Sequence, residues 1–287
     1  MPALRASHRD SRLDSFLVEP RTIEEFGEQW GRFEDLGGRF GSSAFLQDLC
    51  GPLLPLGEIA GRRVLEIGSG NGRIVRMLLD AGAAHVTAVE PSAGIEVLKR
   101  NTRDRADRVT CLQTVGESIP AVDAELAFAI GVLHHLEDPG PTLRRVHEVL
   151  PPGGRCLVWV YGREGNAAYI ALAESLRVLT RRLPDPALAA LAHVLNACLA
   201  VYLPLCRILP LPLRRYMREV MAGFDRRERF FLIFDQLNVG YARYYTGDEA
   251  SDLLAAAGFR KVERYHRHGM SWTVLGEKPA QAEQRAC

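Results

Sequence analysis

Hydrophobic positions between residues 62 and 161 follow two alternating patterns along the chain. Short apolar runs of strand length are each followed by a turn and by a stretch with helical spacing, which is typical of strand–helix repeats. The expected strands cover residues 64–67, 85–90, 109–113, 125–130 and 155–161, and the expected helices cover 74–81, 93–102 and 141–150. These repeats predict a doubly wound parallel sheet that binds its ligand at the carboxyl ends of the strands.

The pattern changes over residues 162–245, which show no strand alternation and are expected to be mostly helical. Within them, residues 187–206 carry no formally charged side chain, and this length is sufficient to cross a membrane. Because His193, Asn196 and Pro204 interrupt the stretch, we interpret it as a helical cap or a subunit interface rather than a span. Membrane-surface contact is an alternative, helped by nearby basic residues: Arg207, Arg214, Arg215 and Arg218.

Both ends of the chain carry helix-start signals. Thr246 and Glu249 form a capping box that predicts the last helix, and two closing strands are expected at 260–266 and 270–276, with His266 and His268 at the surface. The insertion thus lies between the fifth strand and the last helix. Near the N-terminus, Thr22 and Glu25 form a second capping box. The helix that follows carries an apolar stripe that either attaches it to the body or closes over the ligand as a lid: Phe26, Trp30 and Phe33.

Composition narrows the function classes. The chain has 287 residues, 47% of them hydrophobic, and a net charge of +1, which gives no reason to expect a nucleic-acid partner. Its six cysteines are scattered, with no metal-binding spacing, and no secretory signal is visible at the N-terminus. These features favour a cytoplasmic protein with free thiols and without a metal centre.

A glycine-rich turn after the first strand carries the candidate chemistry. Gly68, Gly70 and Gly72 allow the backbone to approach a ligand closely, and the next helix begins directly after them. Two acids accompany the turn, Glu66 before it and Glu90 at the end of the second strand. A nicotinamide dehydrogenase would need the spacing G-x-G-x-x-G, which this turn does not fit.

Five motifs occur in order: V-L-E-I-G-S-G-N-G at 64–72, V-E-P-S at 89–92, E-S-I-P at 117–120, G-V-L-H-H-L at 131–136 and L-P-P-G-G at 150–154. Together they resemble those of class I S-adenosylmethionine-dependent methyltransferases, over roughly residues 60–161 and 246–278. The resemblance implies an α/β fold with a Rossmann-like, doubly wound, seven-stranded mixed sheet. The chain then divides into an N-terminal helical lid (1–60), a cofactor-binding core (61–161), a helical insertion or substrate cap (162–245) and the rest of the core with a tail (246–287).

The resemblance also implies which residues hold S-adenosyl-L-methionine. The glycine turn would pass under the methionine part, Glu66 would address its amino group, and Glu90 would accept both ribose hydroxyls. Val115 stands where relatives often carry an acid for the adenine amino group, so Glu117, backbone near Gly116 or apolar contact would replace that acid. The full expected set is Glu66, Gly68, Ser69, Gly70, Gly72, Glu90, Pro91, Gly116, Glu117, Ile130 and Gly131.

Methyl transfer to a hydroxyl or amine requires alignment of the acceptor and removal of a proton. His134 and His135 follow the fourth strand, and similar enzymes use a histidine here as the base, although either residue could instead order the loop. Tyr161 ends the fifth strand within reach of an acceptor. The expected substrate contacts are Trp30 on the lid and four residues at helical spacing within 234–245, namely Asp235, Asn238, Tyr241 and Tyr245.

These expectations predict methyl transfer to a small molecule, at an oxygen or nitrogen of a natural product, a sugar or a lipophilic intermediate. The apolar insertion favours a bulky acceptor. The alternative is a noncatalytic scaffold, or a membrane-peripheral subunit, that keeps the fold and presents the insertion to a partner. The expected partners are a small-molecule substrate and, as an option, a second copy of the chain, without nucleic acid.

Overall fold

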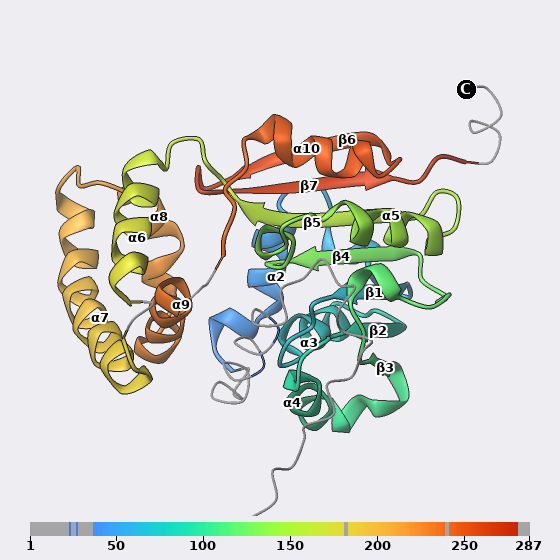
Figure 1. Ribbon diagram of the computed structural model, residues 1–287, viewed down its shortest axis with the longest axis horizontal. Coiled ribbons are helices and arrows are strands. Elements are labelled where there is room, and N and C mark those ends of the chain that lie inside the picture. The colour runs from blue at the N-terminus through green and yellow to red at the C-terminus, as the bar shows by residue number, and fades with distance from the viewer. Residues whose placement is uncertain (1–22, 24–26, 28–36, 181–182, 239–240, 281–287) are drawn as a thin grey trace, which may run out of the picture.

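All five strands expected between residues 62 and 161 form, and they lie side by side in one sheet (Figure 1). The computed structural model describes residues 23, 27, 37–180, 183–238 and 241–280. Its strands are β1 Arg63–Ile67, β2 His85–Val89, β3 Val109–Leu112, β4 Leu126–Ile130, β5 Arg155–Tyr161, β6 Arg260–Arg267 and β7 Ser271–Glu277. Most of the expected lid helix, with Trp30, lies outside the described residues, whereas residues 37–60 of the N-terminal segment are described.

The sheet has the order β3-β2-β1-β4-β5-β7-β6. The first five of these strands are parallel, whereas β7 pairs antiparallel with both β5 and β6. The chain turns to opposite sides of β1 when it makes β2 and β4, so the strand order reverses at this point and leaves a crevice beyond the carboxyl ends of β1 and β4. The predicted seven-stranded mixed sheet is therefore confirmed, with its ligand edge at the glycine turn.

Helices cover both faces of this sheet, as apolar strands buried on both sides require. Helices α2 (Ser43–Cys50), α3 (Arg73–Asp80) and α4 (Gly94–Asn101) pack on one face, and α5 (Gly140–Val149) and α10 (Gly247–Ala256) pack on the other. The capping box expected at Thr246 is present and starts α10. Short 3-10 turns complete the layers at 39–41, 56–58, 103–108, 116–118, 133–135 and 221–223.

The insertion between β5 and α10 is a separate layer of helices beside the carboxyl edge of the sheet (Figure 1). It contains α6 (Ala167–Thr180), α7 (Asp185–Ile208), α8 (Arg214–Glu219) and α9 (Arg226–Asn238). Helices α7 and α9 share a small core of Leu188, Ala192, Phe234 and Leu237. The Asn196 side chain donates a hydrogen bond of 2.7 Å to the Arg226 carbonyl, which fixes the start of α9 against α7.

The helix expected through residues 234–245 is wrong in its second half. Helix α9 ends at Asn238, and the described residues that follow, up to Tyr245, are not helical. Backbone pairing with the end of β5 replaces the helix, because the Tyr245 N–H donates to Tyr161 O at 2.9 Å and the Arg163 N–H donates to Tyr245 O at 2.8 Å. Tyr245 is consequently buried in the core beside α10 rather than aligned with Asp235 on one helix face.

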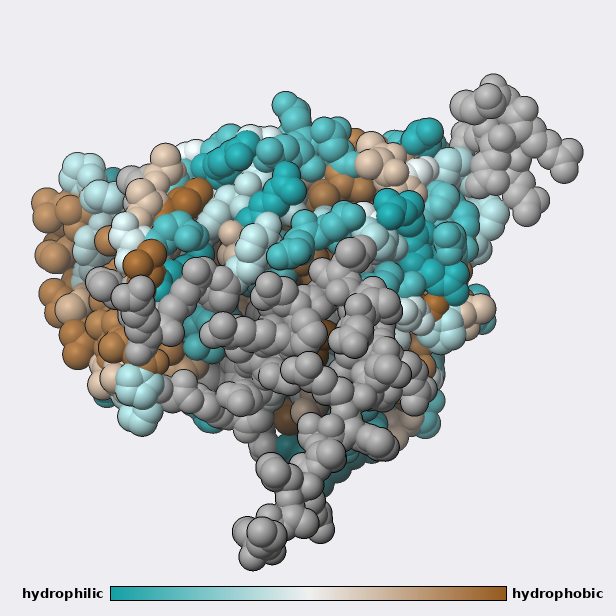
Figure 2. Space-filling model, viewed as in Figure 1, coloured by the Kyte–Doolittle hydropathy of each residue, from teal (hydrophilic) through white to brown (hydrophobic). Residues whose placement is uncertain are grey.

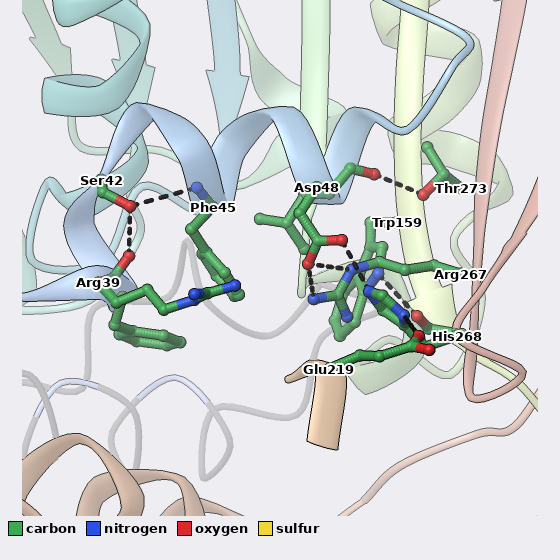
Figure 3. Close-up of polar contacts among 12 residues, drawn as sticks. Arg39, Ser42, Phe45, Asp48, Trp159, Glu219, Arg267, His268 and Thr273 are labelled. Atoms are coloured by element: carbon green, nitrogen blue, oxygen red, sulfur yellow. Dashed lines mark hydrogen bonds and ion pairs between the residues drawn. The ribbon is translucent and has the colours of Figure 1, made fainter. Parts of the chain in front are cut away.

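A polar clamp joins the insertion to the sheet (Figure 3). Asp48 of α2 accepts hydrogen bonds from Arg267 and from His268 Nε2, and His268 Nδ1 lies 2.7 Å from a Glu219 oxygen of α8. The hydrogen bond to Asp48 raises the pKa of His268, so both ring nitrogens can donate, one to each carboxylate. The expectation of a surface His268 is therefore wrong. The β6–β7 turn reaches back to α2 and α8 and leaves only 14% of this side chain exposed.

Candidate active site

Two hollows meet beyond the carboxyl ends of β1 and β4. A narrow cleft of about 100 Å³ runs along the glycine turn, and a cavity of about 690 Å³ lies between that turn and the insertion. The expected cofactor residues that line the cleft are Gly68, Glu90, Pro91, Gly116 and Gly131. Those that line the cavity are Gly68, Ser69, Ile130 and Gly131. Ile23, one of the two described residues before Gly37, also lines the cleft.

The glycine turn has a backbone conformation that favours glycine at three positions. Gly68, Gly70 and Gly72 have φ angles of +70°, +53° and +86°, which side chains disfavour. A Cβ atom added to Gly68 would also lie 2.4 Å from a methyl group of Val132. The Gly68 N–H donates to Val89 O at 2.8 Å, so the turn is tied to the end of β2. Gly72 then begins α3.

Glu90 is the acid that organises the turn. Its side chain is 4% exposed, and its carboxylate accepts hydrogen bonds from Gly70 N at 2.7 Å, from Ser92 N at 3.0 Å and from the Ser92 hydroxyl. A carboxylate offers about four lone-pair positions, so this one retains acceptor capacity at the cleft. The fixed position suits a ligand hydroxyl, and the ribose assignment stays a prediction.

Glu66 lies at the end of β1 with 1% of its surface exposed, and its Oε2 has no hydrogen-bond partner among the described residues. Burial raises the pKa of this carboxyl to about 8, against the lowering influence of Ser69 and Arg73. A buried acid with an unsatisfied oxygen offers the hydrogen-bond acceptor and the negative charge that a cationic amino group needs. Glu66 itself lines neither hollow, but Ser69, which interacts with its carboxyl, lines the cavity, so the residues around the turn fit the methionine part of S-adenosylmethionine.

This pKa predicts how cofactor affinity depends on pH. Below about pH 8 Glu66 holds a proton in the empty site, and a cationic amino group binds its ionised form more tightly. We expect the affinity for S-adenosylhomocysteine to rise between pH 6 and 8 and then to level off. Calorimetric titration across this range checks the slope. In Glu66→Gln the slope disappears, and an unchanged slope in this variant would contradict the assignment.

The part of the cleft around Val115, where the adenine is expected, is mostly apolar. Val115, Leu136 and Thr142 line it. Glu117 does not line either hollow, and its Oε2 lies 3.4 Å from the Thr142 hydroxyl that donates to it. Apolar contact and backbone near Gly116 are therefore better placed for adenine than the Glu117 carboxylate.

His135 lines both hollows, which places its ring where a methyl donor and an acceptor would meet. Its Nδ1 lies 2.8 Å from the Tyr241 carbonyl oxygen, and because that oxygen only accepts, Nδ1 carries the proton. Burial lowers the pKa of His135 to about 4, so the ring is neutral at pH 7. Its Nε2 then carries the lone pair that a general base needs.

His134 is placed differently from its neighbour. Its ring is fully buried, lines neither hollow and stacks on Tyr161 with 3.8 Å between ring centroids. Burial lowers the pKa of His134 well below its ordinary value. Tyr161 does line the cavity, and its hydroxyl oxygen accepts a 2.6 Å hydrogen bond from Gln236 Nε2. Burial raises the pKa of Tyr161, so this phenol stays protonated and can donate to an acceptor.

The expected substrate residues do not all lie at the cavity. Asp235 lines the cavity, whereas Tyr241 contributes its carbonyl to His135 from an exposed position. Asn238 is half-buried and Tyr245 is buried, and neither lines the cavity. Sequence reasoning missed several cavity-lining polar residues: Arg73, Tyr169, Gln236, Tyr244 and Arg267.

Arg73 had a signal in the sequence, because it directly follows the glycine turn. Its guanidinium donates a 3.0 Å hydrogen bond to Phe40 O and lies 3.8 Å from the centre of the Phe40 ring. Burial lowers the pKa of Arg73 to about 10, which still leaves it charged at pH 7. The cavity therefore has a fixed positive charge directly after the glycine turn.

Comparison with known proteins agrees with this geometry. Residues 65–158 match the family described as "Methyltransferase domain". A tRNA U34 carboxymethyltransferase of Chromohalobacter salexigens is 31% identical over 151 residues, which are 50% of this chain and 45% of that protein. A ubiquinone biosynthesis O-methyltransferase of Paracidovorax citrulli is 25% identical over 169 residues, 56% of this chain and 70% of that protein.

A solved structure extends the likeness to nearly the whole chain. Magnesium protoporphyrin IX methyltransferase of Synechocystis PCC 6803 superposes with a TM-score of 0.52, covering 88% of this chain and 93% of that one. At 12% identity this likeness concerns the fold. The chain spans less than half the length of the tRNA U34 carboxymethyltransferases that it matches. Residues 65–158 thus form a methyltransferase domain, and the sheet and helices around them have the fold of the class I S-adenosylmethionine-dependent methyltransferases.

Proposed function

We propose that this protein transfers a methyl group from S-adenosylmethionine to an oxygen or nitrogen of a bulky, lipophilic small molecule, with His135 as the general base. The observation that carries the proposal is the position of His135, which lines both the cofactor cleft and the large cavity. Its Nδ1–H is engaged by the Tyr241 carbonyl, so the proton-accepting nitrogen is Nε2.

When bound, the cofactor supplies an electrophilic methyl group on a sulfonium. The protein must bring an acceptor in line with that methyl group and take its proton. The acceptor O–H or N–H gives its proton to His135 Nε2 as the new O–CH₃ or N–CH₃ bond forms and the S–CH₃ bond breaks. The Tyr241 carbonyl keeps the ring in the required tautomer and stabilises the imidazolium. The Tyr161 hydroxyl can hold the acceptor by a hydrogen bond.

The cavity supports a large and mostly apolar acceptor. Its volume of about 690 Å³ lies within the range of sites for drug-sized ligands. Its wall is mostly aliphatic and aromatic, with side chains such as Phe45, Trp159, Leu199, Met217 and Phe231. Arg73 and Asp235 line the cavity and interact electrostatically with each other, and these charged groups would orient a polar end of the acceptor.

A tRNA base is a second candidate acceptor, because the first relative reported above is named a tRNA U34 carboxymethyltransferase. The expectation that nucleic acid plays no part is accordingly not confirmed. A noncatalytic scaffold is the remaining alternative. The first two functions differ in which molecule receives the methyl group, and a noncatalytic scaffold transfers none.

The test uses the full chain and S-adenosylmethionine labelled in its methyl group. The protein is incubated with a panel of hydrophobic phenols, carboxylic acids and amines, and separately with total tRNA. We expect label in the organic phase, with calorimetric affinity for S-adenosylhomocysteine in the micromolar range, about −8 kcal/mol, and none for NADH. Label in tRNA alone would support the second candidate. Absence of both label and binding would support the scaffold.

A further inference from the structure

Helix α7 leaves one row of apolar side chains uncovered. Val194, Cys198, Val201, Leu205 and Ile208 follow each other at alternating spacings of four and three residues, so they form a single stripe, here called the α7 stripe. Val201 is 64% exposed and Ile208 is 79% exposed. Figure 2 shows hydrophobic residues gathered along the left edge of the molecule, where Figure 1 places α7.

The opposite face of α7 belongs to the protein core. Ala192 and Cys206 are fully buried, and Asn196 is hydrogen-bonded to the start of α9. The segment Pro186–Ile208 is long and apolar enough to cross a membrane, with 22% of its most apolar stretch buried. Because one face is already packed against α9, this helix is suited to lie along a bilayer surface rather than to cross it.

The charged side chains that follow the end of the α7 stripe, up to residue 218, are all arginines. Residues 186–218 contain no aspartate or glutamate, and they contain Arg207, Arg214, Arg215 and Arg218 near their end. Arg214 caps α7 by donating to the Cys206 carbonyl at 2.8 Å. The side chains of Arg207 and Arg218 are exposed. Arg215 pairs with Glu219 at the end of α8, so an anionic lipid surface would supply negative charge chiefly to Arg207 and Arg218.

The stripe is also connected to the acceptor cavity. Cys198 belongs to the stripe, is exposed and lines the cavity, and Leu172 of α6 lines the cavity while 61% exposed. The cavity wall therefore reaches the apolar surface at these two residues. A lipophilic molecule dissolved in a bilayer could enter here without passing through water.

We infer that the α7 stripe and its arginines dock the protein onto an anionic lipid bilayer, from which the acceptor enters the cavity beside Leu172 and Cys198. The docking rests on the stripe and the charges, whereas the delivery of an acceptor rests on the proposed function. A second copy fits this surface less well. A two-fold interface presents the same patch to itself and would bring together the like charges of Arg207 and Arg218, whereas Glu219 already pairs with Arg215 and His268.

The test is flotation of the full chain with vesicles of phosphatidylcholine, alone or with about one third phosphatidylglycerol. We expect binding to the anionic vesicles that weakens as salt is added. Val201→Ser/Ile208→Ser should weaken binding at least tenfold. Arg207→Ala/Arg218→Ala should weaken it about thirty-fold, from about 1 kcal/mol for each basic residue at such a surface. Arg103→Ala/Arg144→Ala removes equal charge from exposed sites on other elements and should bind like the parent.

The other possible outcomes test the membrane inference and the proposed function separately. Vesicle binding that is absent, or equal in parent and Val201→Ser/Ile208→Ser, overturns the membrane inference, and normal affinity for S-adenosylhomocysteine would then leave the proposed function intact. A dimer in solution that Val201→Ser/Ile208→Ser converts to a monomer, without vesicle binding, assigns the stripe to a second copy. Stripe-dependent vesicle binding without cofactor binding supports the inference and removes the proposed function.

Discussion

Replacing His135 by alanine is expected to lower kcat by about 10²–10⁴-fold, the usual contribution of a positioned general base. The acceptor then has to lose its proton without a positioned base. Because the ring makes no ionic contribution while neutral, affinity for S-adenosylhomocysteine should change little. Single-turnover methyl transfer with labelled cofactor measures the chemical step, and calorimetry measures the affinity.

The pH profile separates a base from a merely structural ring. With the pKa of His135 lowered to about 4, the ring is neutral above that pH and becomes a cation below it. A protonated ring cannot accept a proton, so kcat/KM should be flat near neutrality and fall as pH drops through about 4. His135→Ala should lose this acid limb. A variant with the parent rate would show that the acceptor is already nucleophilic and needs no base.

Tyr161→Phe is the matched control. Phenylalanine keeps the stacked ring beside His134 and removes only the hydroxyl that Gln236 contacts. A neutral hydrogen bond contributes about 1 kcal/mol, so we expect a loss of only about five-fold in kcat/KM. A loss as large as that of His135→Ala would transfer the leading role from the histidine to the phenol.

The central strands β1, β2, β4 and β5 were predictable from the sequence because they are largely buried and glycine or proline follows each within two residues. The expected range 155–161 coincides with β5, and each of the other four strands differs from expectation by one residue at one end. Local capping signals were equally reliable, as Thr246 at the start of α10 shows. These features depend on neighbours in the chain, which a sequence displays directly.

The cavity wall was not predictable to the same degree, because it depends on contacts between distant segments. Helical spacing put Tyr245 with Asp235, but backbone pairing with Tyr161 and Arg163 ends the helical register and places Tyr244 in the cavity instead. Arg267 reaches the cavity only because Asp48 of α2, more than 200 residues earlier, holds it there. A single sequence carries no spacing rule for such pairs.

Replacing Glu90 by alanine is expected to weaken S-adenosylhomocysteine binding at least 10²-fold. Two hydrogen bonds from ribose hydroxyls to a carboxylate contribute about 1.5–3 kcal/mol each, and both would be lost. The Gly70 N–H would also lose its 2.7 Å acceptor, which loosens the glycine turn under the ligand. Calorimetry on the purified variant measures this loss directly.

The fold of the Glu90→Ala variant needs its own measurement, because Ser92 and Gly70 both donate to this carboxylate. Leaving buried donors unpaired costs about 1–3 kcal/mol each, so a lower Tm with a cooperative transition is expected. Glu125→Ala is the matched control. This acid precedes β4 at the opposite edge of the sheet, where it pairs with Arg62, so its loss should leave cofactor affinity unchanged. Tight binding retained by a folded Glu90→Ala protein would refute the ribose assignment, and the apolar cleft around Val115 would then have to hold the nucleoside without it.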